Sequence, residues 1–187
     1  MIAGVPTESF PGERRVALVP DVVRTLTDKG VQVLLQAGAG ARAGYPDVAF
    51  AEAGAEVIEA REQLFARADV ILQVRTHGAD AAGAADLPLL RSGQTVIGFA
   101  DALDAGQRLQ ALAATGIALF AMELMPRITR AQSMDALSSM ATIAGYKAVL
   151  MAAFELPRIF PLLMTAAGTL APAKVLIIGA GVAGLQA

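Results

Sequence analysis

Residues 174–184 read Lys-Val-Leu-Ile-Ile-Gly-Ala-Gly-Val-Ala-Gly, and this stretch decides the fold class of the 187-residue chain. Its four consecutive aliphatic residues, 175–178, are typical of a strand buried on both faces of a parallel sheet. Gly179, Gly181 and Gly184 follow at once in the G-x-G-x-x-G spacing that dinucleotide-binding folds place between a strand and a helix. The stretch therefore predicts the first strand and turn of a Rossmann unit.

The three glycines suit a bound pyrophosphate in three ways. Gly179 allows a tight turn, Gly181 lets the backbone approach the ligand without a Cβ, and Gly184 lies where a helix N-terminus presents its amides. The same spacing occurs in ordinary turns, so a plain strand-to-helix turn is the alternative interpretation. An acidic residue that holds the ribose should follow about 20 residues later. Because the sequence stops at Ala187, we expect a chain truncated within a nucleotide-binding unit.

Upstream of this stretch, strand-like runs alternate with helical patterns, as they do in βα units. The expected strands are residues 2–5, 31–35, 55–58, 69–74, 95–99 and 117–122. The expected helices are residues 20–30, 46–53, 62–68 and 104–115, with Asp104 as an N-cap of the last. The predicted class is α/β, with a Rossmann-like parallel sheet in an N-terminal domain.

A longer helix is expected over residues 133–156, where small and apolar residues recur at helical spacing until Pro157. Such a rod suits a link between two domains. The expected plan is an N-terminal α/β domain at 1–132, a linking helix at 133–156, and at 157–187 a hinge and the first βα turn of a truncated, second Rossmann domain that binds a dinucleotide.

Composition excludes several classes of function. The 15 Lys and Arg residues and 17 Asp and Glu residues are scattered, so no basic surface for a nucleic acid or an anionic membrane is expected. The absence of cysteine excludes disulfides, a thiol nucleophile and a thiolate metal site, and no metal site is expected. The longest uncharged run, between Arg158 and Lys174, is broken by prolines and too short to span a bilayer. With no secretory signal at the start, a cytoplasmic setting is expected.

Residues 127–138, Arg-Ile-Thr-Arg-Ala-Gln-Ser-Met-Asp-Ala-Leu-Ser, are unusually polar for this chain. In one interpretation Ser133 is the N-cap of the long helix and the arginines lie in a solvated loop. Asp135 is then an acidic residue in the first turn, where the helix dipole favours a negative charge. In the other, Arg127, Gln132 and Asp135 converge on a cleft that suits a carboxamide and a ribose, with Ser138 one turn further on. Both interpretations stand on the sequence alone.

Four motifs carry a resemblance to a known family: Gly12-Glu-Arg-Arg-Val-Ala-Leu-Val-Pro20, the block from Pro126 to Ala141, Gly145-Tyr-Lys147, and Ala166-Ala-Gly-Thr together with the glycine motif. Over its full length the chain resembles the alpha subunit of proton-translocating NAD(P) transhydrogenases, in its soluble NAD(H)-binding component, domain I. Alanine dehydrogenases share the fold and the N-terminal pattern.

The resemblance implies an NAD(H) site at two places in the chain. Its nicotinamide end would be surrounded by Arg127, Ile128, Thr129, Arg130, Gln132, Asp135 and Ser138. Its pyrophosphate would be lined by Gly179, Gly181, Val182 and Gly184. No residue is expected to act as a chemical catalyst, because hydride transfer between two nicotinamides needs orientation and close approach only.

The resemblance also implies the activity and its setting. Domain I would pass a hydride from NADH to NADP⁺ held on a partner component, as part of a Si-specific NAD(P)⁺ transhydrogenase that is both oxidoreductase and proton translocase. The implied partners are the membrane and NADP-binding subunits and a second copy of this chain, in a homodimer. The implied location is the cytoplasmic side of the inner membrane, held there through the partner subunits without direct insertion.

Two alternatives stay open. An L-alanine dehydrogenase would need an acid/base group and cations for a carboxylate; Arg15 matches the carboxylate-binding arginine of those enzymes, and Arg75 stands where they carry a lysine. Their histidine after Phe99 is replaced by Ala100-Asp101-Ala102, which counts against that activity. Arg15 pairing with a nearby acid, Arg75 ending a strand, and His77 in a solvated loop are the simpler interpretations. The third possibility is an inactive fragment with a structural or regulatory role.

We predict that residues 1–187, expressed alone, have little or no affinity for NADH. The glycine turn would lack the neighbouring strands that bury its own strand, and a strand left exposed in this way favours association or misfolding. Titration with NADH, followed by nucleotide fluorescence, measures this affinity. Micromolar binding would contradict the prediction.

Overall fold

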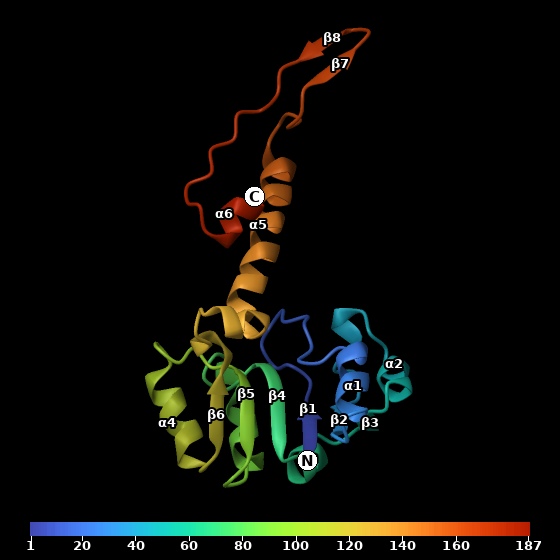
Figure 1. The fold of residues 1–187 in the computed structure, drawn as a ribbon, viewed down its shortest axis with the longest axis vertical. Coiled ribbons are helices and arrows are strands. Elements are labelled where there is room, and N and C mark those ends of the chain that lie inside the picture. Colours follow the sequence, from blue (N-terminus) through green and yellow to red (C-terminus); the bar gives the residue numbers. More distant parts are fainter. The chain divides into compact units, whose positions relative to one another are not determined.

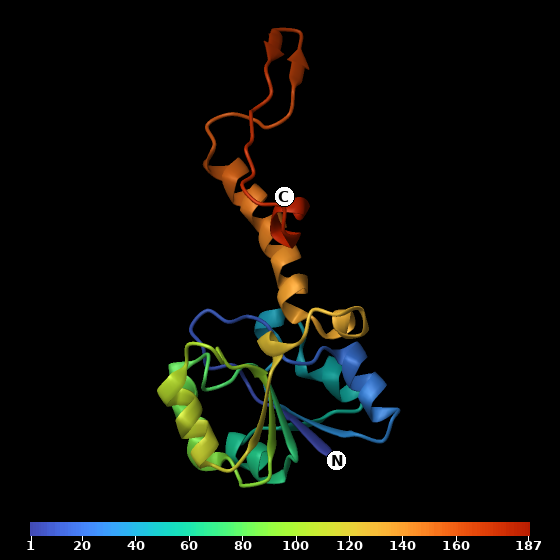
Figure 2. The same cartoon turned by 60° about the vertical axis from the view of Figure 1, so that its left-hand side comes forward.

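The structure is a computed structural model that describes residues 1–187. The chain divides into two compact units, Met1–Met125 and Pro126–Ala187. Figures 1 and 2 show a sheet flanked by helices in the first unit and a long helix with a hairpin in the second.

The first unit is built on one six-stranded sheet in the order β3-β2-β1-β4-β5-β6. Every neighbouring pair in it is parallel. The strands are β1 (Ile2–Val5), β2 (Gln32–Gln36), β3 (Glu56–Ile58), β4 (Val70–Arg75), β5 (Thr95–Phe99) and β6 (Ala118–Ala121). This order is that of the Rossmann fold, in which the direction of winding reverses between β1 and β4. The predicted α/β, Rossmann-like class is confirmed.

Helices cover both faces of this sheet (Figure 1). They are α1 (Pro20–Thr27), α2 (Asp47–Glu52), α3 (Arg61–Arg67) and α4 (Gly106–Ala114), with 3₁₀ turns η1 (Ala41–Ala43), η2 (Ala81–Leu89) and η3 (Met122–Leu124). Two apolar clusters follow from the alternation of side chains along β2, since Val33 and Leu35 pack with Phe50 of α2, whereas Leu34 packs with Phe65 of α3. Burial on both faces is what a parallel sheet requires.

The start of α4 differs from the prediction. Asp104 is not its N-cap, because α4 begins at Gly106 after Ala105, and no side chain caps it. The amides of Asp104 and Ala105 both donate to the carbonyl oxygen of Asp101, so a separate turn precedes the helix. The 3₁₀ turn η2 was not predicted, since its Ala-, Gly- and Pro-containing sequence has no helical periodicity.

The second unit consists of η4 (Thr129–Met134), α5 (Ala136–Glu155), a hairpin of β7 (Leu163–Thr165) and β8 (Gly168–Leu170), and α6 (Val182–Gln186). The predicted end of the long helix is confirmed, because α5 is followed by Leu156 as its C-cap and then by Pro157. The antiparallel hairpin occupies part of the stretch expected as a hinge. Both views show α6 lying beside α5 (Figures 1 and 2).

The predicted strand at residues 174–178 is absent. These residues have no regular secondary structure, and their apolar side chains are exposed, Ile178 to 92%. A strand needs a hydrogen-bonded neighbour, and none of the strands of the chain pairs with this segment. The aliphatic run therefore belongs to no sheet.

One helix, α5, is long and apolar enough to cross a membrane by length and composition alone. The length of uncharged runs in the sequence does not indicate it, because α5 carries Lys147 near its middle. A lysine at the centre of a bilayer costs roughly 2.5–3.5 kcal/mol, which weakens this candidate span.

Candidate functional site

The polar segment before α5 folds as a 3₁₀ turn followed by a capped helix. Asp135 is the N-cap, and its carboxylate accepts hydrogen bonds from the Ser138 amide at 3.0 Å and the Ser138 hydroxyl at 2.6 Å. The prediction that Ser133 caps the helix is wrong. Ser133 lies inside η4, before the start of α5. The Ser138 amide in the first turn of α5 instead donates to Asp135, three residues before it.

A cavity of about 730 Å³ lies at this start of α5. Most of its wall comes from the polar segment, and one residue comes from the glycine turn. The lining residues are Pro126, Arg127, Ile128, Thr129, Gln132, Asp135, Ser138, Ser139 and Val182. Arg127, Gln132, Asp135 and Ser138 are thus brought together, whereas Arg130 and the three glycines of the motif do not line the cavity.

The Asp135 carboxylate in this cavity is stabilised in its ionised form. Hydrogen bonds from Ser138, then the positive charge of Arg127, lower the pKa of Asp135 below its ordinary value. Asp135 is therefore an anion at neutral pH, with its oxygens already held by Ser138. Arg127 and Gln132 are exposed, and their side chains offer amide and guanidinium donors and one amide oxygen acceptor. The cavity can bind polar groups, and the ionisable side chains that line it are the Arg127 guanidinium and the Asp135 carboxylate.

Packing explains one glycine of the turn beside this cavity, and backbone conformation explains another. A Cβ at Gly184 would overlap the carbonyl oxygen of Gly179, so the turn closes only with glycine there. Gly179 itself has a φ of 112°, a conformation that side chains rarely adopt. Gly181 differs, since its φ of −76° is open to any residue and no atom lies within 4 Å of a Cβ placed on it. Nothing within the chain requires glycine at position 181.

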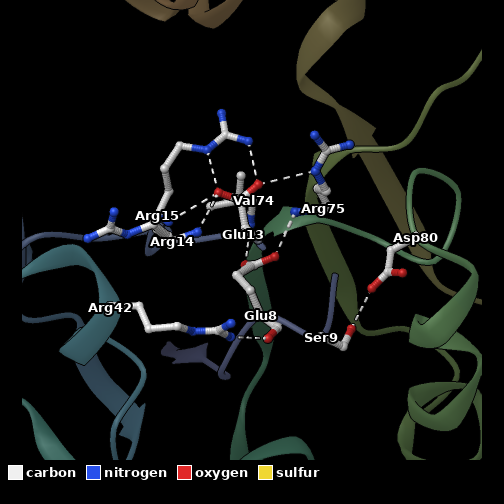
Figure 3. A network of polar contacts seen from close by, with 9 residues as sticks. All are labelled: Glu8, Ser9, Glu13, Arg14, Arg15, Arg42, Val74, Arg75 and Asp80. Atoms are coloured by element: carbon white, nitrogen blue, oxygen red, sulfur yellow. Dashed lines mark hydrogen bonds and ion pairs between the residues drawn. The ribbon is translucent and has the colours of Figure 1, made fainter. Parts of the chain in front are cut away.

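A second polar cluster lies in the first unit, at the carboxyl ends of the neighbouring strands β1 and β4 (Figure 3). The Glu13 carboxylate accepts from Arg15 at 2.6 and 2.7 Å and from Nε of Arg75 at 3.2 Å. The Arg75 guanidinium also stacks 4.2 Å from the ring centre of Phe10. Arg15 therefore pairs with a nearby acid and Arg75 is the last residue of β4, as the simpler interpretations expected, and Arg75 also shares the Glu13 carboxylate.

The pKa values of the two carboxylates in this cluster are shifted in opposite directions. The Arg15 hydrogen bonds lower the pKa of Glu13 to about 2. Burial raises the pKa of Glu8, although its carboxylate accepts from the amides of Val74 at 2.6 Å and Arg75 at 3.0 Å. Glu8 thereby joins the segment after β1 to the end of β4, and Figure 3 shows it beside Glu13.

The remaining sequence candidates lie in loops after β4 and β5. His77 is half-buried rather than fully solvated, with Nδ1 3.1 Å from the carbonyl oxygen of Asp80. Asp101 lies in the loop after Phe99, where alanine dehydrogenases are expected to carry a histidine. Its φ of 54° is in the left-handed region. Glu123 fixes this loop by accepting from the amides of Ala100 and Ala102. Sequence reasoning missed Glu123, because its partners are over 20 residues away.

Two family descriptions match the sequence of this α/β chain. "Alanine dehydrogenase/PNT, N-terminal domain" matches residues 4–144, and "Alanine dehydrogenase/PNT, C-terminal domain" matches residues 148–187. The chain belongs to the alanine dehydrogenase/PNT family.

Within this family, the chain is more similar in sequence to transhydrogenase subunits than to an alanine dehydrogenase. The chain is 44% identical to an NAD(P) transhydrogenase subunit alpha polypeptide of Rhodospirillum rubrum, over 100% of the chain and 49% of the relative. It is 32% identical to the alanine dehydrogenase of Mycolicibacterium smegmatis, over 100% and 49%. A transhydrogenase structure from Sinorhizobium meliloti has a TM-score of 0.92 at 46% identity, over 100% of this chain and 54% of the other. The chain thus spans about half the length of these relatives, and the resemblance to transhydrogenase alpha subunits is confirmed.

Glu13→Gln tests the cluster in the first unit. The pKa of Glu13 is about 2 in the folded protein against an ordinary 4.5, so the ionised group stabilises the fold above pH 4.5 and this stabilisation is lost as pH falls toward 2. We expect the variant to lower the free energy of unfolding at neutral pH by about 2 kcal/mol, less than the full shift gives because both arginines are partly solvated. Urea unfolding across this pH range should show the difference from wild type shrinking below pH 4.5.

Glu56→Gln is the matched control for Glu13→Gln. Glu56 binds Arg67 through two hydrogen bonds of 2.6 and 2.7 Å, but both side chains are exposed. A much smaller effect is expected there. Equal losses of stability in the two variants would contradict the importance assigned to Glu13.

Proposed function

We propose that this chain is part of the NAD(H)-binding component of a proton-translocating NAD(P) transhydrogenase. The observation that carries the proposal is the cavity in which Arg127, Gln132, Asp135 and Ser138 meet Val182 of the glycine turn. These are residues that the family resemblance assigns to the two ends of one dinucleotide. Identity of 44% to a transhydrogenase subunit, against 32% to an alanine dehydrogenase, supports this choice.

The residues present fit a dinucleotide. Gly181 has open space where a Cβ would stand, although neither its backbone conformation nor its packing requires glycine. Close approach of a phosphate to this backbone accounts for the residue. Together with Gly179, Val182 and Gly184 it would hold the pyrophosphate. The guanidinium of Arg127 and the amide of Gln132 would hold the carboxamide, and the ionised Asp135 would accept from a ribose hydroxyl.

A bound nicotinamide would supply the hydride, which passes directly to a second nicotinamide on a partner component. The chain's own residues would contribute orientation. Ser138 holds the Asp135 carboxylate in place through two hydrogen bonds, and a fixed acceptor lowers the entropic barrier of aligning two rings. Ile128 and Thr129 would complete the cavity wall. Arg130, which lies in the same 3₁₀ turn, would contribute charge from outside the cavity.

The proposal extends to domain plan, partners and location. Residues 1–132 would form the N-terminal domain, 133–156 the linking helix, and 157–187 the hinge and first βα turn of an NAD-binding domain. NADP(H) would be held on a partner component, proton movement would occur in a membrane subunit, and the complex would place this chain on the cytoplasmic side of the membrane. The proposal also includes a homodimer.

The full-length gene product tests the activity. We expect it to bind NADH and to pass a hydride to NADP⁺ when an NADP-binding transhydrogenase component is added, measured by absorbance with an acetylpyridine analogue of the acceptor. L-alanine and NAD⁺ provide the opposing assay. Alanine-dependent reduction of NAD⁺, without transhydrogenation when the partner is present, would overturn the proposal in favour of an alanine dehydrogenase.

Arg127→Ala tests the cavity itself. Arg127 is exposed, so the fold should not depend on it, while loss of one charged hydrogen bond worth about 1.4 kcal/mol raises a Kd about tenfold. We expect this rise in the Kd for NADH by fluorescence titration of the full-length protein. Arg24→Ala, which removes an exposed arginine of α1, should leave the Kd unchanged. Equal affinities in wild type and Arg127→Ala would contradict the assignment.

A further inference from the structure

Gly145 lies at the middle of α5 and is the only buried residue of that helix. A Cβ at this position would overlap the carbonyl oxygen of Ala183 in α6, and its carbonyl carbon and Cα would lie at 2.9 and 3.0 Å. These atoms are backbone, which cannot rotate away as a side chain can. Any side chain at position 145 would therefore push α6 away from α5.

Glycine at this position works against the helix itself. In a helix interior, glycine costs about 0.5–1 kcal/mol relative to alanine. The backbone of Gly145 is helical and has no positive φ, so conformation does not explain the residue. The close approach of α6, seen beside α5 in Figures 1 and 2, does.

The contact at Gly145 also bears on the cavity. Ala183 follows Val182, the one residue of the glycine turn that lines the cavity with Arg127 and Asp135. The turn is closed against itself, because a Cβ at Gly184 would overlap Gly179. A shift of Ala183 would therefore move α6 and the turn together, away from the polar segment at the start of α5.

We propose that Gly145 is a positioning residue that sets the distance between the glycine turn and the polar segment, and thereby the affinity for the dinucleotide. This inference rests on the proposed NAD(H) site. Gly145 does not line the cavity, so it acts through the backbone of α6.

Gly145→Ala in the full-length protein tests this role. We expect the KM for NADH to rise at least tenfold, while the KM for NADP⁺, bound on the partner component, stays unchanged. Amide hydrogen exchange without nucleotide should become faster in α6, where the Leu185 amide donates to the Gly181 carbonyl, and stay unchanged in the sheet of the first unit. A general loss of folding would change both units and both KM values.

Two control variants separate steric overlap from helix propensity. Gly106→Ala makes the same change at the start of α4, where no atom lies within 4 Å of the new Cβ, and should leave nucleotide binding unchanged. Ala144→Gly alters helix propensity beside Gly145 at an exposed position and should also leave the KM for NADH unchanged. An effect of Ala144→Gly as large as that of Gly145→Ala would overturn the steric explanation.

The outcomes distinguish this inference from the proposed function. Wild-type protein that fails to bind NADH would overturn both. Wild-type binding with an unchanged KM in Gly145→Ala would overturn the positioning role alone, even if exchange in α6 becomes faster. Should Gly145→Ala fail to fold, Val182→Ala shortens the side chain that α6 brings into the cavity without changing α5. An unchanged Kd for NADH in Val182→Ala would then overturn the inference.

Discussion

A parallel strand needs hydrogen-bonded neighbours and cover on both faces, and this constraint governs both units of the chain. In the first unit it is met, because β1 and β4 lie between other strands and Gly4 leaves room for α3 to pack close, with Leu64 Cδ2 only 2.7 Å from the position of a Cβ. In the second unit the equally aliphatic residues 175–178 have no neighbouring strand and form none. Both units contain aliphatic runs, but only those of the first unit have neighbouring strands to pair with.

Asp135 both caps a helix and lines a cavity. Asp135 caps α5, and the same hydrogen bonds to Ser138 fix its carboxylate on the wall of the cavity. A group that starts a helix is held more rigidly than one in a free loop, which suits it to orient a ligand. Arg127 and Gln132, which capping leaves without a role, line the same cavity.

Local signals predicted much of the fold. The strands at residues 2–5 and 95–99 were predicted to the residue, because each is an isolated apolar run between turn-forming residues. Helix caps were less predictable, since Asp104 and Ser133 have the right chemistry for a cap but lie within turns that depend on the backbone of preceding residues. The role of Gly145 could not be predicted, because only α6, about 40 positions later, gives it a reason.

The same limit applies to the polar clusters. The motif around Glu13 and Arg15 was visible in the sequence, and their mutual hydrogen bonds are local. The contacts of Glu8 and Glu123 could not be predicted, because each carboxylate binds backbone amides brought close only by the sheet. Such contacts leave no periodic trace in the sequence.

The exposed run at residues 175–178 has a practical consequence for handling residues 1–187 on their own. Four adjacent aliphatic side chains on a segment that is paired with no strand form a template on which another molecule can add a strand. Lys174 is the one charged residue that directly flanks the run, and a single charge gives weak protection against such addition. Preparations of this chain should accordingly form β-rich aggregates with rising concentration or salt, with this segment as their first point of contact.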